Sequence, residues 1–308
     1  MRLAHFFVLF VLMWFAEQAI AQELEPRKYA NTPTDVNVIG LGYAWSNGNV
    51  LLDPALSIED LDADLHLIFA NYLYSFGLFG KNAKFRALLP ATTGRWEGTV
   101  NGIQGSRRDQ GIGDAWVSLE WNFAGAPALE RKGMSTYRPQ WVFGTSVLVS
   151  IPVGSYDKDE LLNLGTNRWS LRTELAAART FGRWTIEGVA GVRVFTDNDK
   201  LLGDNTLKQD PFYTLKGAVI YSFKQPGMWL AAAYGWGVGG QTAVNGISRQ
   251  TEQRNIRLGT TFAFPFSRRH GGAITYVTGL AKGAGSDYDT LAFSYHYAWG
   301  KGMAQADR

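Results

Sequence analysis

TLAFSYHYAW, residues 290–299, alternates between large apolar side chains and small or polar ones. The large ones are Leu291, Phe293, Tyr295, Tyr297 and Trp299. Successive side chains of a β-strand point to opposite faces, so this strand has one aromatic face and one small, mostly neutral face. The second face is unlike the charged surface of a soluble sandwich, but it suits the lumen of a membrane barrel. The stretch predicts a transmembrane strand with Phe293, Tyr295, Tyr297 and Trp299 in a lipid-facing aromatic belt.

The same two-residue alternation recurs along the chain. Its other clear instances are residues 114–122, 169–176, 184–194, 213–223 and 255–264. Weaker instances are residues 39–45, 64–74, 83–89, 143–151, 228–236 and 273–281. Each candidate strand has about 9 to 13 residues, the length that crosses a bilayer at a tilt. Together they predict an all-β fold, a transmembrane antiparallel up-and-down β-barrel of about 12 strands spanning residues 36–299.

The connections between these candidate strands alternate in length. The long ones are residues 46–61, 90–113, 152–167, 196–210 and 238–253, and the short ones are 76–82, 180–183, 224–227 and 265–271. One connection expected to be short, residues 124–140, is longer and breaks the pattern. Outer-membrane barrels have short periplasmic turns and long outer loops, and an even strand count places both termini in the periplasm. The alternation therefore supports a barrel in the outer membrane of a Gram-negative bacterium.

The first residues have the features of a secretory signal. A short basic start precedes an apolar run at residues 6–15, and Ala19-Ile-Ala21 is a small-x-small cleavage pattern. The apolar run is about half as long as a spanning helix requires. We therefore expect residues 1–21 to be a signal peptide that is cleaved after Ala21.

The remaining boundaries follow from the strand pattern. Residues 22–35 carry Pro26 and Pro33, so we expect an extended N-terminal segment in the periplasm, lying either below the barrel or inside its lumen. Residues 300–308 form a polar C-terminal tail that we expect to be loose. We detect no further domain boundary.

Composition excludes several classes of function. The chain has no cysteine, which rules out thiol catalysis, disulfides and cysteine-ligated metals. No apolar stretch approaches 18 residues, which argues against a helical inner-membrane protein. The net charge of +3 comes from scattered Lys and Arg residues, so no nucleic-acid partner is expected.

Charged residues inside the candidate strands all fall on the face opposite the apolar one. They are Lys84, Arg86, Asp114, Glu120, Arg172, Glu174, Glu187, Arg193, Lys216 and Arg257, and the polar His296 shares that face of the last strand. A charge on the lipid face would cost about 2–4 kcal/mol at the bilayer midplane, so these residues should line the lumen. They could set the selectivity of a pore, or they could form cross-strand ion pairs that brace a closed or plugged interior.

Signatures of enzymes are mostly missing from the sequence. The glycine-rich Gly235-Trp-Gly-Val-Gly-Gly240 is not followed by a helix, so we interpret it as a packed strand end and not as a dinucleotide site. Ser294 and His296 share a strand face, but nucleophilic catalysis needs closer contact and an orienting acid. A barrel-embedded lipid enzyme is therefore a minor alternative. We expect no enzymatic activity, no cofactor and no metal.

Several blocks of the sequence resemble one family of proteobacterial outer-membrane proteins. The most specific block is NLGTNRWS at residues 163–170. Others are ELEPRxYxNxP at 23–33, GD at 113–114, GAPAL at 125–129, GRWT at 182–185, FTDN at 195–198, QDP at 209–211 and GSDYDTL at 285–291. The family is named for the meta-cleavage pathway of phenol degradation. The resemblance implies an outer-membrane channel or transporter, in some members associated with uptake of aromatic compounds. Such barrels usually end on the last aromatic residue, whereas this chain continues beyond Trp299.

These observations predict a porin-like channel for passive or facilitated diffusion of small molecules, with aromatic or hydrophobic solutes suggested only by the family. The alternative is a barrel without a transport role that acts as a scaffold or adhesin through its long loops. The expected partners are outer-membrane lipids, lipopolysaccharide, the outer-membrane assembly machinery and small-molecule solutes. The oligomeric state stays open, although a monomer is favoured.

Overall fold

The computed structural model describes residues 24–49, 55, 58–100, 102–248, 251–281 and 287–303. The predicted signal peptide, with its cleavage pattern at Ala19 and Ala21, and residues 304–308 of the predicted tail lie outside this part of the chain.

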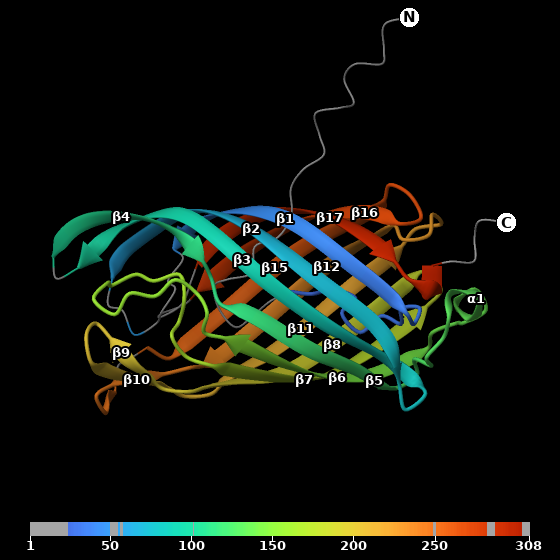
Figure 1. Ribbon diagram of the computed structural model, residues 1–308, viewed down its shortest axis with the longest axis horizontal. Coiled ribbons are helices and arrows are strands. Elements are labelled where there is room, and N and C mark those ends of the chain that lie inside the picture. The colour runs from blue at the N-terminus through green and yellow to red at the C-terminus, as the bar shows by residue number, and fades with distance from the viewer. Residues whose placement is uncertain are drawn as a thin grey trace, which may run out of the picture.

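The described chain is a closed antiparallel barrel of 12 strands (Figure 1). The strands are β1 (Val36–Asn49), β2 (Glu59–Leu78), β3 (Lys81–Val100), β5 (Ala115–Ala124), β6 (Trp141–Ile151), β7 (Ser170–Phe181), β8 (Trp184–Phe195), β11 (Phe212–Ser222), β12 (Trp229–Gly239), β15 (Gln253–Pro265), β16 (His270–Ala281) and β17 (Asp287–Trp299). Each pairs with the next, and β1 also pairs with β17, which closes the barrel. The predicted fold class is confirmed.

The long connections contain strands of their own. β4 (Ile103–Ile112) pairs with the outer half of β3 in a hairpin that extends beyond the barrel wall. β9 (Asn198–Leu201), β10 (Asn205–Gln209), β13 (Thr242–Val244) and β14 (Ile247–Ser248) form a separate four-stranded sheet. The alternation did not reveal these strands because they are short or, like β4, exposed on both faces.

The two ends of the barrel differ (Figure 1). The β4 hairpin and the small sheet lie at one end, which we call the loop end. Tight turns and the helix α1 (Arg131–Met134) lie at the other, which we call the turn end. α1 falls within residues 124–140, the connection whose length broke the predicted pattern. Among the described residues, no helix is long and apolar enough to cross a membrane.

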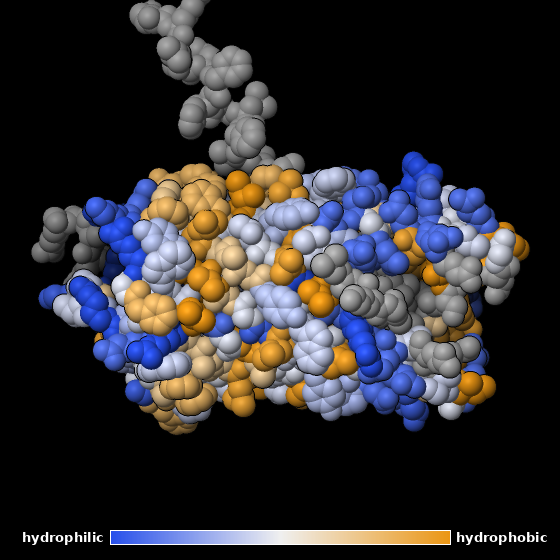
Figure 2. All heavy atoms as spheres, turned by 180° about the vertical axis from the view of Figure 1, so that it is seen from behind, coloured by the Kyte–Doolittle hydropathy of each residue, from blue (hydrophilic) through white to orange (hydrophobic). Residues whose placement is uncertain are grey.

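Burial follows the alternation that the sequence shows. On β7, Leu171 and Leu175 are exposed on the outer face, whereas Arg172 and Glu174 are almost fully buried inside. Figure 2 shows hydrophobic residues over much of the barrel wall and hydrophilic residues toward both ends. This is the distribution expected of a barrel with lipid outside and polar groups within.

Aromatic rings on the outer wall form a girdle near the turn end. Contacts run from Trp184 and Tyr221 through Phe223, Phe262, Phe264 and Phe266 to Tyr295. His270 links Tyr295 to Tyr297, which stacks on Trp299 with ring centroids 5.7 Å apart. Phe293 lies two positions from Tyr295 and is partly exposed. The predicted belt residues thus share one face of β17, and their contact with lipid stays a prediction.

The described part of the C-terminal tail is folded. Lys301–Met303 form a short 3-10 helix, and the Gly302 amide donates a hydrogen bond to the Asp35 carbonyl at 3.2 Å. Gly302 is buried where β1 begins. The expectation of a loose tail is therefore wrong for residues 300–303.

A charge placed on the outer wall should destabilise the barrel. Leu175 is 65% exposed at the middle of β7. We expect Leu175→Arg to lower the free energy of unfolding in lipid vesicles by about 2–4 kcal/mol, because a guanidinium at the bilayer midplane loses its hydration. Ile247→Arg is the control, since Ile247 is 67% exposed on β14 at the loop end. Equal losses in the two variants, measured by denaturant titration, would contradict the assigned membrane-facing wall.

Candidate functional site

The N-terminal segment lies inside the barrel. The segment leaves the lumen at the turn end. There the Thr34 amide donates a hydrogen bond to the Leu129 carbonyl at 2.9 Å, and the Asp35 amide donates one to the Ser75 carbonyl at 2.7 Å. Lys28 and Tyr29 are almost fully buried. The sequence left open whether this segment lies below the barrel or inside its lumen, and the structure places it in the lumen. We call residues 24–34 the plug.

The plug is compact where we expected an extended chain. The Lys28 amide donates to the Glu25 carbonyl at 3.2 Å, and the Ala30 amide donates to the Arg27 carbonyl at 2.9 Å. Arg27 has a positive φ of 67°, which these consecutive turns require. Pro26 fixes one φ angle, but it does not prevent turns on either side of it.

One side of the plug pairs with a buried carboxylate on β7. Lys28 Nζ lies 2.7 Å from Glu174 Oε2 and 3.2 Å from Glu25 Oε2. Lys216 Nζ on β11 lies 2.5 Å from Glu174 Oε1, and Arg172 Nε lies 3.6 Å from the same oxygen. The Tyr29 hydroxyl donates to Glu174 Oε2 at 3.2 Å. Glu174 therefore joins the plug to two strands of the wall.

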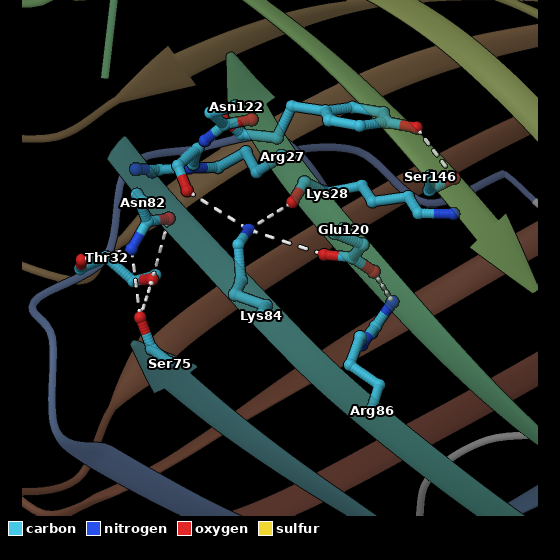
Figure 3. A network of polar contacts seen from close by, with 12 residues as sticks. Arg27, Lys28, Thr32, Ser75, Asn82, Lys84, Arg86, Glu120, Asn122 and Ser146 are labelled. Carbon is cyan, nitrogen blue, oxygen red and sulfur yellow. Dashed lines mark hydrogen bonds and ion pairs between the residues drawn. The ribbon is translucent and has the colours of Figure 1, made fainter. Parts of the chain in front are cut away.

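The other side of the plug pairs with β3 and β5 (Figure 3). Arg86 Nη1 lies 2.9 Å from Glu25 Oε1 and 3.2 Å from Glu120 Oε1. Lys84 Nζ lies 3.6 Å from Glu120 Oε2, and it donates to the Lys28 carbonyl and, at 3.1 Å, to the Ala30 carbonyl. The wall thus provides partners both for the charged side chain of Glu25 and for the backbone carbonyls of Lys28 and Ala30.

Neutral polar residues complete the attachment. Asn122 Nδ2 donates to the Tyr29 carbonyl at 3.0 Å, and the Tyr29 hydroxyl donates to Ser146 Oγ at 3.0 Å. Asn82 Nδ2 donates to the Thr32 carbonyl at 2.9 Å and to Ser75 Oγ at 3.0 Å (Figure 3). These side chains carry no formal charge, so the charge pattern of the strands does not single them out, although they lie on the same inward face.

The far wall contacts the first plug residues. The Arg27 amide donates to Glu187 Oε2 on β8 at 2.8 Å, and its guanidinium lies 5.6 Å from the centroid of the Trp229 ring on β12. Leu24 lies against Gly235 and Gly259, where an added Cβ would meet its methyl groups at 3.0 and 2.9 Å. The plug therefore reaches from β3 across the lumen to β15.

The structure brings together seven of the lumen residues predicted from sequence: Lys84, Arg86, Glu120, Arg172, Glu174, Glu187 and Lys216. All of them lie against the plug or pair with a residue that does. Ion pairing inside the barrel was one of the two alternatives left open. Their use as a selectivity lining stays a prediction.

Four predicted lumen residues lie elsewhere. Asp114 accepts hydrogen bonds from the Gly154 amide at 2.9 Å and from the amide and hydroxyl of Thr166 at 2.9 and 2.6 Å, and so fixes the loop after β6. Arg193 and Arg257 lie nearer the loop end. His296 faces inward at the turn end, and within the described residues no hydrogen bond joins it to Ser294.

An apolar cluster lies inside the barrel toward the loop end. Inward-facing residues of β2 pack with residues from β3, from the loop after β6 and from the small sheet. These are Leu61, Ala63, Leu65, Leu67, Trp96, Leu162, Leu164, Leu201 and Leu207. We call them the loop-end cluster. Apolar side chains alternate with Asp62, Asp64 and His66 along residues 61–67, and the apolar ones face inward. The expectation of a polar inward face is therefore wrong for this part of β2.

The surrounding charges favour the ionised forms of Glu25 and Lys28 in the plug. Burial alone raises the pKa of the Glu25 carboxyl, but the cations Lys28, Arg86 and Arg172 outweigh it and hold that pKa well below its ordinary value of 4.5. Burial lowers the pKa of the Lys28 ammonium, but Glu25 and Glu174 outweigh burial and raise it. Across the described ranges, no group of three or more His, Asp or Glu side chains is placed to hold a metal ion.

The barrel strands carry the similarity of this chain to a known protein family. The family described as "Putative MetA-pathway of phenol degradation" matches residues 39–297. The chain belongs to this family. The match begins and ends within the barrel and does not include the plug. A search of curated proteins found no match.

Two solved structures share the fold of this phenol-degradation family member. An outer-membrane channel from Pseudomonas putida F1 is 19% identical, with a TM-score of 0.73 over 90% of this chain and 100% of that one. The β domain of the Bordetella autotransporter BrkA is 12% identical, with a TM-score of 0.53 over 86% of this chain and 100% of that one. Both similarities concern the fold.

Removing the negative charge of the Glu174 carboxylate should strongly destabilise the folded protein. Glu174→Gln would leave the ammonium groups of Lys28 and Lys216 buried without their shared anion, which should cost about 3–5 kcal/mol of unfolding free energy. Asp197→Asn is the matched control, because Asp197 pairs with Lys208 at an exposed site and should cost about 0–1 kcal/mol. Similar denaturation midpoints for the two variants would show that the plug network contributes little stability.

The plug should resist mild acid. Because the folded pKa of Glu25 is lowered, its ion pairs stabilise the protein above the ordinary value of 4.5 and are lost only as pH falls through the lower folded value. We expect the amides of residues 27–30 to keep the same protection factors, after correction for intrinsic exchange rates, from about pH 8 to about pH 5. Hydrogen–deuterium exchange mass spectrometry measures this. Loss of protection between these pH values would contradict the assigned charge states.

Proposed function

We propose that this protein is an outer-membrane channel that passes small molecules through its lumen when the plug moves aside. The observation that carries this proposal is how the plug is held, by ion pairs and hydrogen bonds to the wall. Water can replace such contacts without exposing a hydrophobic core, so the plug can leave the lumen while the strands of the barrel stay paired. The outer-membrane channel from Pseudomonas putida F1 supports the proposal through its shared fold.

In this proposal the solutes are small and partly apolar. They enter through the loop-end cluster and then pass the charged section beside the plug. The phenol-degradation description of the family supports aromatic compounds as one class of solute. The inward charges, such as Arg172 and Lys216, set the ion preference of the open state. The turn end faces the periplasm, and a single chain contacts lipid and lipopolysaccharide.

A second function is favoured by the same plug. A lumen crossed by a charge-paired segment also suits a barrel that transports nothing and supports the envelope through its outer loops. Conductance distinguishes the two functions, because only a channel gains current when the plug is loosened.

Lys28→Met should open the channel. The change removes the ammonium group that lies between the carboxylates of Glu25 and Glu174. The backbone hydrogen bonds of residue 28 can still form. A loss of about 3 kcal/mol from the plugged state would raise the open population by about two orders of magnitude. We expect rare openings for the unchanged protein in a planar bilayer and frequent, discrete steps for Lys28→Met.

Lys208→Met is the control for this experiment, since Lys208 pairs with Asp197 at the loop end, away from the plug. Its conductance should match that of the unchanged protein. If Lys28→Met folds and inserts but conducts no more than the control, the channel proposal is wrong and the non-transporting barrel is favoured. Heat-modifiable mobility in detergent gels reports whether each variant is folded.

A further inference from the structure

Arg257 differs from the charged residues that hold the plug. It faces inward from β15 and is 2% exposed. Its guanidinium carbon lies 4.0 Å from the centroid of the Tyr288 ring, but Nη1 and Nη2 have no hydrogen-bond partner within the described residues. Lys28, Lys84 and Arg86, in contrast, each lie within 4 Å of a carboxylate.

Such a side chain is costly unless something pairs with it. Burying an unpaired charge costs several kcal/mol after relaxation, whereas a cation–π contact returns about 0.5–2 kcal/mol. The Tyr288 ring lies over the guanidinium, and the two terminal nitrogens have no hydrogen-bond partner in the part of the chain that the structure describes. The guanidinium edge that carries them matches the two oxygens of a carboxylate, which binds it through two parallel hydrogen bonds.

Glycines flank Arg257 on both sides in the barrel wall. Its register partners on the two neighbouring strands are Gly235 on β12 and Gly279 on β16. Lys216 on β11 is the register partner of Gly235 on the other side, so a glycine separates two inward cations. Among the described residues, an added Cβ at Gly235 would first meet the side chain of Leu24 from the plug, at 3.0 Å. This arrangement gives a role to Gly235, the first residue of the glycine-rich stretch at 235–240.

An apolar region adjoins the same place. Tyr288, whose ring lies against Arg257, also packs against the loop-end cluster. A molecule with its anionic group at Arg257 would therefore have its apolar part beside Tyr288 and the leucines of that cluster. The two halves of the lumen, charged and apolar, meet at this residue pair.

We propose that Arg257 and Tyr288 form a binding site for a hydrophobic organic acid in transit, with its carboxylate on the guanidinium edge and its apolar body toward the loop-end cluster. The proposal rests on the channel function and names the chemical class of one solute. Leu24 occupies the adjoining space over Gly235, so movement of the plug would clear the route onward from the site.

The test uses full-length protein in detergent and three probes: benzoate, benzyl alcohol and inorganic phosphate. Isothermal titration calorimetry should show that benzoate binds more tightly than benzyl alcohol, which has the ring but no carboxylate. Arg257→Gln should weaken benzoate binding by about tenfold or more and leave benzyl alcohol unchanged, because only the charge-assisted pair is lost. Arg257→Lys keeps the charge but not the planar fork and should lie between the two.

Arg254→Gln is the matched control, since Arg254 lies on the same strand but is exposed and pairs with Glu252. It should bind benzoate as the unchanged protein does. Equal affinity for benzoate and benzyl alcohol, or unaltered benzoate binding in folded Arg257→Gln, would overturn the site. Phosphate binding as tightly as benzoate would overturn the assignment to organic acids. If Arg257→Gln does not fold, the result for Arg257→Lys decides.

Conductance of Lys28→Met separates this inference from the channel proposal. Currents that benzoate does not alter, together with absent binding, would refute the site and leave the channel intact. Benzoate binding that depends on Arg257 in a protein without current would keep the site and refute transport. Benzoate block of the current, relieved in the double variant with Arg257→Gln, is the result expected if both are correct.

Discussion

The pairing of β1 with β17 is the constraint on which the rest of the structure depends. In a bilayer there is no water to satisfy backbone amides and carbonyls, so an open sheet edge would be prohibitively costly. The register from Asn37 with Trp299 to Asn49 with Asp287 removes that edge. Closure also fixes which face of every strand turns inward. The polar residues of the inward face must then find partners inside a narrow space, and the plug supplies many of them.

The plug solves an electrostatic problem that closure creates. Glu120 and Glu174 are almost fully buried, and a buried carboxylate is tolerated only when it is paired. The wall supplies Lys216 and Arg86, and the plug adds Lys28 and the hydroxyl of Tyr29. The plug's own carboxylate, Glu25, pairs with Arg86. The network is consequently shared between a fixed wall and a segment that is not part of the sheet. A structure of this kind can be stable when closed and still allow the plug to exchange its contacts for water.

The lumen is also divided along its length. Leu65, Leu67 and Trp96 belong to an apolar cluster at the loop end, whereas Glu174 and Lys216 lie in the charged section. A solute crossing such a lumen meets two different environments in succession. Arg257 lies at their boundary through Tyr288, which contacts both the guanidinium and the apolar cluster. This division gives a physical reason to consider molecules that have both an apolar body and a charged group.

The sequence by itself determined the barrel, because alternation such as that of residues 290–299 is a local property that each strand displays independently. It also assigned Glu174, Arg172 and Lys216 to the inward face, since a charge on the lipid face would be too costly. It did not reveal the β4 hairpin, the turns of the plug, the apolar cluster at the loop end or the attachment of Asp114 to a loop. Those features depend on contacts between residues far apart in the chain, such as Lys28 with Glu174. Only the tertiary structure decided them, because pairing inside a lumen depends on which strands face each other across it, and no local pattern records that.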